Sequence, residues 1–166
     1  MHESTIRLDK FPKTNRRRFL VGTATLAGMA GMGLSLTVEP AAATPQSMRA
    51  AIKKVVGEAP IKRGRLKMDL PPLIENGNAV PLTIAGESPM TAADHIKAIH
   101  VFTEKNPQPN VVSIYLGPRA GRANVSTRIR LADTQRVVAI AEMSDGTFWS
   151  EEVEVVVTLA ACLEEA

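Results

Sequence analysis

Residues 122–131 read Arg-Ala-Asn-Val-Ser-Thr-Arg-Ile-Arg-Leu, and this stretch decides the fold class. Its odd-numbered positions carry Ala, Val, Thr, Ile and Leu, while the positions between them are polar or basic. Because successive side chains of a strand point to opposite faces, this alternation predicts a half-buried β-strand with a charged outer face.

Six further runs of this kind are expected over about 64–70, 79–85, 96–103, 111–117, 136–143 and 152–159. Turn-forming residues separate them, as in Asn76-Gly77-Asn78 and Ser144-Asp145-Gly146. A helix is predicted over 46–56, where apolar residues recur at helical spacing before Gly57. Seven short strands spaced roughly ten residues apart predict an all-β fold, an immunoglobulin-like antiparallel β-sandwich with a short N-terminal helix and a C-terminal arm.

The first 43 residues have the features of an export signal. A basic segment containing Arg16 and Arg17 precedes a weakly hydrophobic run that ends at the small-residue site Ala41-Ala42-Ala43. The segment resembles a twin-arginine signal, so we expect a periplasmic protein cleaved between Ala43 and Thr44. An uncleaved membrane anchor is the alternative, since about 20 apolar residues span a bilayer. Gly and Thr dilute the run, which favours cleavage and no stable membrane insertion.

The basic charge of the chain belongs to this leader. Of the 166 residues, 20 are Lys or Arg and 17 are Asp or Glu, but 14 of each lie in 44–166. A neutral body gives no electrostatic basis for binding nucleic acid. The predicted organisation is an export signal over 1–43, a sandwich domain over 44–159 and a tail over 160–166.

The predicted sandwich contains no evident catalytic or metal-binding constellation. His95 and His100 are separated by five positions, which places them on opposite faces of a strand and makes a shared metal site improbable. We interpret three methionines as core filler rather than soft copper ligands: Met68, Met90 and Met143. We interpret four arginines as a solvated strand face rather than a patch for partner proteins: Arg119, Arg122, Arg128 and Arg130. No metal and no cofactor are expected.

Cys162 is the one candidate for chemistry. It is the only cysteine, so an intramolecular disulfide is impossible. In an oxidising compartment such a thiol is either an intermolecular link or a reactive group, and the alternative is a small apolar residue that ends the last strand. Residues from Ala160 onward are expected to project beyond the fold or to lie on its rim. An extended chain from Thr158 to Cys162 reaches on the order of 15 Å, which suits delivery of a thiol into another protein's pocket.

Several segments have a family-specific wording. Residues 75–81 read Glu-Asn-Gly-Asn-Ala-Val-Pro, and Ser88-Pro89-Met90-Thr91 follows. Together with residues 95–100, 104–109, 126–132 and 141–149, and in this order, they resemble the SoxY family, the carrier proteins of bacterial thiosulfate oxidation. The resemblance implies an immunoglobulin-like domain paired with SoxZ in a heterodimer. It also implies that Cys162 carries sulfur intermediates covalently, including a persulfide, without a catalytic site of the protein's own.

The resemblance further implies SoxXA, SoxB and SoxCD as transient partners. In the family the cysteine sits in Gly-Gly-Cys-Gly-Gly, whereas here Ala160, Ala161, Leu163 and Glu164 replace the glycines. Two alternatives therefore stay open. One is a diverged paralogue that pairs with SoxZ as a binding or regulatory subunit without carrying sulfur. The other is an exported redox or metal-handling protein that uses Cys162 together with Met and His.

Overall fold

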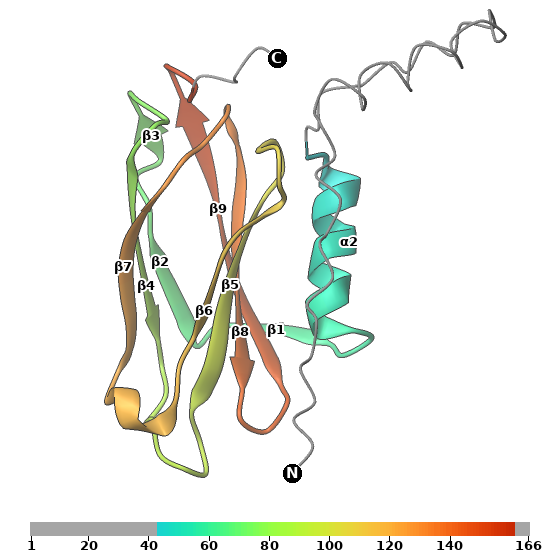
Figure 1. Cartoon of the computed structure of the whole chain (residues 1–166), viewed down its shortest axis with the longest axis vertical. Helices are drawn as coiled ribbons and strands as arrows, with labels where there is room; N and C mark the ends of the chain where they lie inside the picture. The colour runs from blue at the N-terminus through green and yellow to red at the C-terminus, as the bar shows by residue number, and fades with distance from the viewer. Residues whose placement is uncertain (1–42, 162–166) are drawn as a thin grey trace, which may run out of the picture. The chain divides into compact units, whose positions relative to one another are not determined.

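The computed structural model describes residues 43–161 as two β-sheets packed face to face, with one helix against the larger sheet (Figure 1). The elements of this part are α2 (Pro45–Val56), β1 (Ile61–Arg63), β2 (Leu66–Asp69), β3 (Leu73–Ile74), β4 (Val80–Gly86), β5 (Ile96–Thr103), β6 (Asn110–Tyr115), the 3₁₀ turn η1 (Pro118–Ala120), β7 (Ala123–Ile129), β8 (Gln135–Met143) and β9 (Phe148–Val157). Across residues 43–161, no helix is long and apolar enough to cross a bilayer.

The strand order confirms the predicted β-sandwich. The larger sheet runs β1-β9-β8-β5-β6 with β3 also paired to β9, and the smaller sheet runs β2-β4-β7. Neighbours pair antiparallel except β1 and β3, which both run parallel to β9. β9 therefore pairs with its hairpin neighbour β8 and with two short strands, β1 and β3, from a distant part of the chain.

The core lies between the two sheets, where the period-two pattern turns apolar side chains inward. Leu82 and Ile84 of β4 pack in one cluster with Ile99 and Val101 of β5 and Val137 of β8, all of them fully buried. Burial of each such side chain is worth about 1.5–3 kcal/mol. Met90 and Met143 are buried in the same cluster and Met68 packs against it, which confirms the interpretation of these methionines as core filler.

Helix α2 begins and ends where the sequence predicts. Thr44 and Ser47 form a capping box, in which the Thr44 N–H donates to Ser47 Oγ at 2.7 Å and the Ser47 N–H to Thr44 Oγ1 at 3.1 Å. Gly57 ends the helix with a positive φ of 63°, and its N–H donates to the carbonyl of Lys53. The apolar face covers the outer side of β5 and β8, where Met48 and Val56 pack against Phe102, Val138 and Ile140.

The expectation of seven strands is wrong, because the described part contains nine. β1 and β3 have only three and two residues, too short to show an alternation, and both exist through pairing with β9. β9 begins at Phe148 rather than near 152 and ends at Val157 rather than 159. Thr127 was predicted to face inward but is exposed, because β7 is the edge strand of the smaller sheet.

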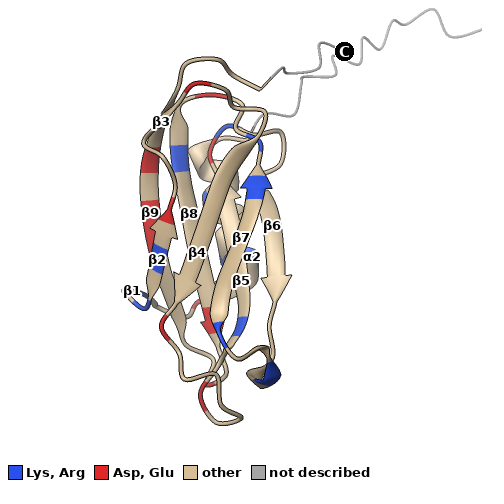
Figure 2. Cartoon of the chain, turned by 90° about the vertical axis from the view of Figure 1, so that its left-hand side faces the viewer, with Lys and Arg blue, Asp and Glu red and all other residues tan. Residues whose placement is uncertain are grey.

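Charges are spread over the surface without one dominant sign (Figure 2). Acidic residues follow β9, where Glu152 and Glu154 lie 4.0 and 3.9 Å from the guanidinium of Arg136 on β8. The four arginines interpreted as a solvated strand face are divided between the two ends of β7: Arg119 and Arg122 precede this strand, while Arg128 and Arg130 lie at its far end. Five strand residues at about 3.3 Å each lie between Arg122 and Arg128, so the two pairs do not form a single basic patch.

The buried position of Leu82 yields a stability prediction. Leu82→Ala leaves a cavity between the sheets and should lower the free energy of unfolding by about 2–5 kcal/mol. The same substitution at Leu73, whose side chain is 59% exposed, should change it by less than about 0.5 kcal/mol. Urea unfolding of both variants measures the difference. Equal effects of the two substitutions would contradict the assigned core.

Candidate functional site

Some of the site residues predicted from the sequence lie within the described residues 43–161, and others lie outside them. Cys162 and the signal residues Arg16 and Arg17 lie outside the described residues. Ala43 and Thr44, the predicted cleavage junction, lie at the start of α2, where Ala43 is buried and Thr44 is the N-cap. The surroundings of Cys162 are therefore defined by the residues that lead up to it, Val157–Ala161.

After β9 the chain is held by main-chain hydrogen bonds to two distant loops. The Gly77 N–H donates to the Leu159 carbonyl at 2.8 Å, and the Leu131 N–H donates to the Gly77 carbonyl at 2.8 Å. The Ala161 N–H donates to the Leu131 carbonyl at 3.1 Å, and Ala161 is only 7% exposed. We call these four residues, Gly77, Leu131, Leu159 and Ala161, the tail anchor.

Gly77 makes this meeting of three segments possible. A Cβ atom at residue 77 would lie 2.2 Å from the Leu131 carbonyl oxygen and 2.9 Å from the Ala161 nitrogen. Both neighbours are backbone atoms, so they cannot move aside without breaking the anchor. The requirement at this position is the close approach of backbones, for which glycine is the suitable residue.

The residues between β9 and the anchor are braced by side chains. The Val157 N–H donates to Thr134 Oγ1 at 3.0 Å. The Thr158 N–H donates to the Ile74 carbonyl at 2.9 Å, and its hydroxyl lies 3.3 and 3.2 Å from the carbonyl oxygens of Ile74 and Glu75. Thr158 thereby ties the chain to β3 and turns it away from the strand direction.

Asn106 supports the anchor from the other side. Its Nδ2 donates to the Arg130 carbonyl at 2.7 Å, and its Oδ1 accepts from the Ala132 N–H at 3.0 Å and from Gln135 Nε2 at 2.9 Å. The Asn106 carbonyl accepts from the Ala43 N–H at 2.8 Å. Because Asn106 and Gln135 are buried, loss of these bonds would leave polar groups unsatisfied, at a cost of about 1–3 kcal/mol each.

Of the two positions expected for the tail, these contacts support the rim of the fold for Ala161 rather than projection beyond it. The packed domain continues through Ala161, and Leu159 and Ala161 are fixed rather than extended. A reach of about 15 Å from Thr158 therefore does not apply to the anchored chain. Covalent geometry places the Cα atom of Cys162 about 3.8 Å from that of Ala161.

The two histidines are separate, as the sequence predicts. His100 is buried on β5, with Nδ1 2.8 Å from Ser113 Oγ. Burial lowers the pKa of His100 below its ordinary value, and the nearby carboxylate of Glu142 opposes this only in part. Nδ1 of His95 lies 3.0 Å from the Thr91 carbonyl oxygen. Within residues 43–161, no group of three His, Cys, Asp or Glu side chains is placed to hold a metal ion.

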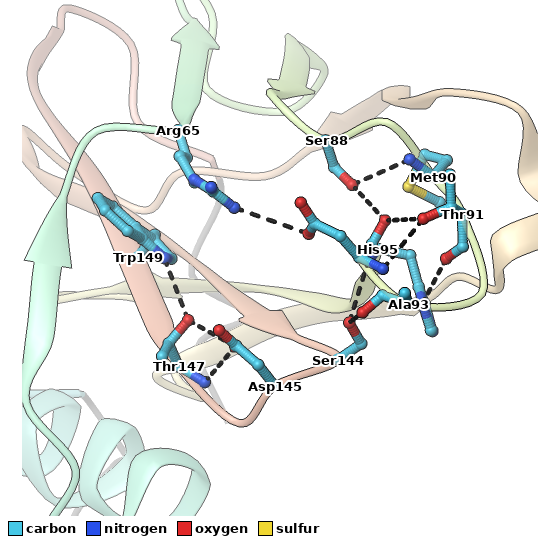
Figure 3. A network of polar contacts seen from close by, with 11 residues as sticks. Arg65, Ser88, Met90, Thr91, Ala93, His95, Ser144, Asp145, Thr147 and Trp149 are labelled. Carbon is cyan, nitrogen blue, oxygen red and sulfur yellow. Dashed lines mark hydrogen bonds and ion pairs between the residues drawn. The ribbon is translucent and has the colours of Figure 1, made fainter.

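His95 belongs to a polar network that joins three loops at the other end of the sandwich (Figure 3). The Arg65 guanidinium lies 3.7 Å from an Asp94 carboxylate oxygen and 5.3 Å from the centre of the Trp149 ring. Asp145 accepts from the Thr147 N–H and hydroxyl in the β8–β9 turn. Together with the bond from Ser144 Oγ to the Ala93 carbonyl at 3.0 Å, these contacts link the β1–β2, β4–β5 and β8–β9 connections, which lie at the opposite end of the sandwich from the end of β9 (Figure 1).

Sequence reasoning missed the residues that build the anchor. Gly77 and Asn106 were interpreted only as turn residues, since each lies in a Pro, Gly or Asn-rich connection. Both act on a third loop around Leu131, which is far away in the sequence. A glycine between two asparagines was the only local signal, and it indicates a turn without revealing which backbone comes close.

The fold and the anchor define a two-layer β-sandwich protein in which the buried anchor residue Ala161 directly precedes the single cysteine of the sequence. A family model described as Sulfur oxidation protein SoxY matches residues 52–162, a range that ends at Cys162. The chain belongs to the SoxY family.

Solved structures agree with this assignment. The sulfur carrier protein SoxY from Chlorobium limicola f thiosulfatophilum is 30% identical with a TM-score of 0.58, and the match covers 69% of this chain and 98% of that one. The superoxide reductase (neelaredoxin) from Ignicoccus hospitalis is 19% identical with a TM-score of 0.50, covering 69% and 94%, and shows similarity of fold alone. No curated protein matches the chain.

The geometry at Gly77 predicts that a single methyl group loosens the anchor. Gly77→Ala should lower the free energy of unfolding by about 1–3 kcal/mol, because the new Cβ overlaps backbone atoms. It should also speed hydrogen exchange at the Ala161 amide, whose bond to Leu131 is displaced. Gly117→Ala is the matched control, since a Cβ there meets nothing within 4 Å. Unchanged exchange at Ala161 in the Gly77 variant would contradict the anchor.

The buried imidazole of His100 predicts a pH dependence. Its lowered pKa means that the unfolded chain binds the proton more readily than the folded one. This contribution to stability is therefore present above the unfolded pKa of about 6.5 and decreases as the pH falls below it. Urea unfolding at about pH 7.5 and about pH 5.5 should show a smaller loss of stability for His100→Phe than for the wild type. An equal loss in both proteins would refute the assignment.

Proposed function

We propose that this protein is a periplasmic sulfur carrier that holds thiosulfate-derived intermediates covalently on Cys162 and presents them to Sox enzymes. The observation that carries the proposal is the placement of the only cysteine directly after the tail anchor, at the last residue of the family match. The SoxY protein from Chlorobium is a sulfur carrier, and the match covers 98% of that protein and 69% of this chain.

The chemistry requires only a thiolate and partner enzymes. The Cys162 thiolate sulfur forms a bond with the sulfane sulfur of thiosulfate, and the two electrons released pass to a c-type cytochrome, SoxXA. Water then attacks the terminal sulfonate sulfur in SoxB, the bond between this sulfur and the sulfane sulfur breaks, and sulfate leaves with release of two protons. A persulfide remains on Cys162, and further partners such as SoxCD oxidise or transfer its outer sulfur.

The carrier supplies position rather than catalysis. The anchor is built mainly from backbone hydrogen bonds, and no side chain among Gly77, Leu131, Leu159 and Ala161 is an acid or a base. A thiol fixed to a folded body in this way reaches each enzyme at a high effective concentration. In this proposal the stable partner is SoxZ, and the twin-arginine leader exports the folded pair.

The departure from the glycine-flanked arm supports a second candidate. With Ala160 and Ala161 before the cysteine and Leu163 and Glu164 after it, the segment is bulkier than the family arm. This observation favours a diverged subunit that pairs with SoxZ without carrying sulfur. The two candidates differ in the chemical state of Cys162 in cells that oxidise thiosulfate.

The carrier function predicts a specific effect of removing one sulfur atom. Cys162→Ser should abolish the sulfur adducts that mass spectrometry detects after incubation with thiosulfate, SoxXA and SoxZ. Thiosulfate-dependent reduction of the cytochrome should fall to the level measured without carrier. Thermal unfolding should stay unchanged, because the exchange of a thiol for a hydroxyl removes none of the core contacts made by residues 43–161.

The matched control is Ser126→Ala, an exposed substitution on β7 that should load sulfur at the wild-type rate. Wild-type protein that carries only a free thiol under these conditions would favour the regulatory subunit. An unchanged rate of cytochrome reduction in Cys162→Ser would show that this cysteine carries nothing.

A further inference from the structure

Exposed apolar side chains gather beside the tail anchor. Of the five large hydrophobic residues that the structure shows exposed within residues 43–161, three lie at this end: Leu73 (59%), Val156 (51%) and Leu159 (60%). Leu73 and Val156 are direct neighbours in the parallel pairing of β3 with β9, so their side chains share one face. Leu159 is itself an anchor residue. We call these three residues the apolar rim.

A pocket adjoins the apolar rim. It has a volume of about 260 Å³, lies between β3 and the start of β4, and shares Leu73 with the rim. Ile74, Val80 and Pro81 line it, together with the carboxylate-bearing Glu75. Within the described residues Glu75 takes part in no ion pair closer than 4.0 Å. A pocket of this size accepts one apolar side chain, and its acidic lining favours a basic group beside that side chain.

The tail anchor limits the distance between this surface and any enzyme that reacts with Cys162. The Cα atom of Cys162 is about 3.8 Å from that of Ala161, which is buried and bonded to Leu131. An active site that reacts with the Cys162 sulfur must therefore approach the body of the domain. The surface beside the anchor, where β3 lies next to the end of β9 (Figure 1), is then within the contact area.

Resting on the proposed carrier function, we infer that the apolar rim and its pocket form the docking surface for the enzyme that joins thiosulfate to Cys162. The enzyme inserts an apolar side chain of its active-site entrance into the pocket and places a basic group against Glu75. Interfaces concentrate their binding energy in such buried central contacts. Because Leu73 and Val156 are exposed in the carrier, docking removes their apolar surface from water.

The test changes the rim without touching Cys162. Leu73→Glu and Val156→Glu, each in complex with SoxZ, should lower kcat/KM for loading by SoxXA about tenfold or more, with the carrier complex as the varied substrate. The loss should lie in KM, while kcat at saturating carrier stays near the wild-type value, since the thiol and its anchor are intact. Tyr115→Glu is the matched control, because Tyr115 is 76% exposed on β6, three strands away from β9. It should load at the wild-type rate.

The following results decide the outcome. The reaction of Cys162 with a small thiol reagent should be equally fast in all variants, which shows that accessibility is unchanged. Loading of Leu73→Glu and Val156→Glu at the wild-type kcat/KM would overturn the inference while leaving the carrier function intact. Failure of wild-type protein to load would instead refute the carrier function itself. Loss of SoxZ from the two variants in gel filtration would identify the rim as the subunit interface and would also overturn the inference.

Discussion

The close approach of the Gly77 backbone to Leu131 and Ala161 is the constraint on which the functional end of this molecule depends. Three segments that are far apart in the sequence meet there through main-chain hydrogen bonds, and a single Cβ atom at residue 77 would separate them. Asn106 completes the arrangement by holding the Arg130–Ala132 segment from its other side. The end of β9, and therefore the exit of the chain toward Cys162, is fixed by contacts that lie outside β9.

A fixed exit changes what kind of carrier this chain is. A glycine-flanked arm samples many conformations and must lose that freedom each time it enters an active site. Here the residues before the cysteine are already ordered through Ala161, so less conformational entropy remains to be lost on docking. The same order shortens the reach of the thiol. In the proposed docking the body of the domain takes part in recognition, which links the anchored exit to the exposed apolar residues beside it.

The sequence predicted the sandwich because strand-length apolar runs recur between turn-forming residues, and some of these runs alternate, as residues 122–131 do. The strands β5 and β8 are instead buried along almost their whole length. It did not predict β1 and β3, whose two or three residues form strands only because β9 lies alongside them. Counting cysteines was enough to single out Cys162. Nothing local in Thr158–Ala161 indicated that these residues are held. Their partners are Ile74 of the two-residue strand β3 and Gly77 and Leu131 of two loops, and the positions of all three depend on the complete fold.

The two ends of the sandwich differ in their side chains: polar contacts join the connections at one end, and apolar side chains are exposed at the other. At the end away from the anchor, Arg65 joins Asp94 and Trp149, and polar side chains link three connections (Figure 3). At the anchor end the backbone groups satisfy one another, which leaves Leu73 and Leu159 exposed without polar cover. Exposed apolar side chains scattered singly are normal, whereas a group of them around the exit of the only cysteine is typical of a contact surface. The backbone bonding of the anchor is thus what frees this surface for a partner.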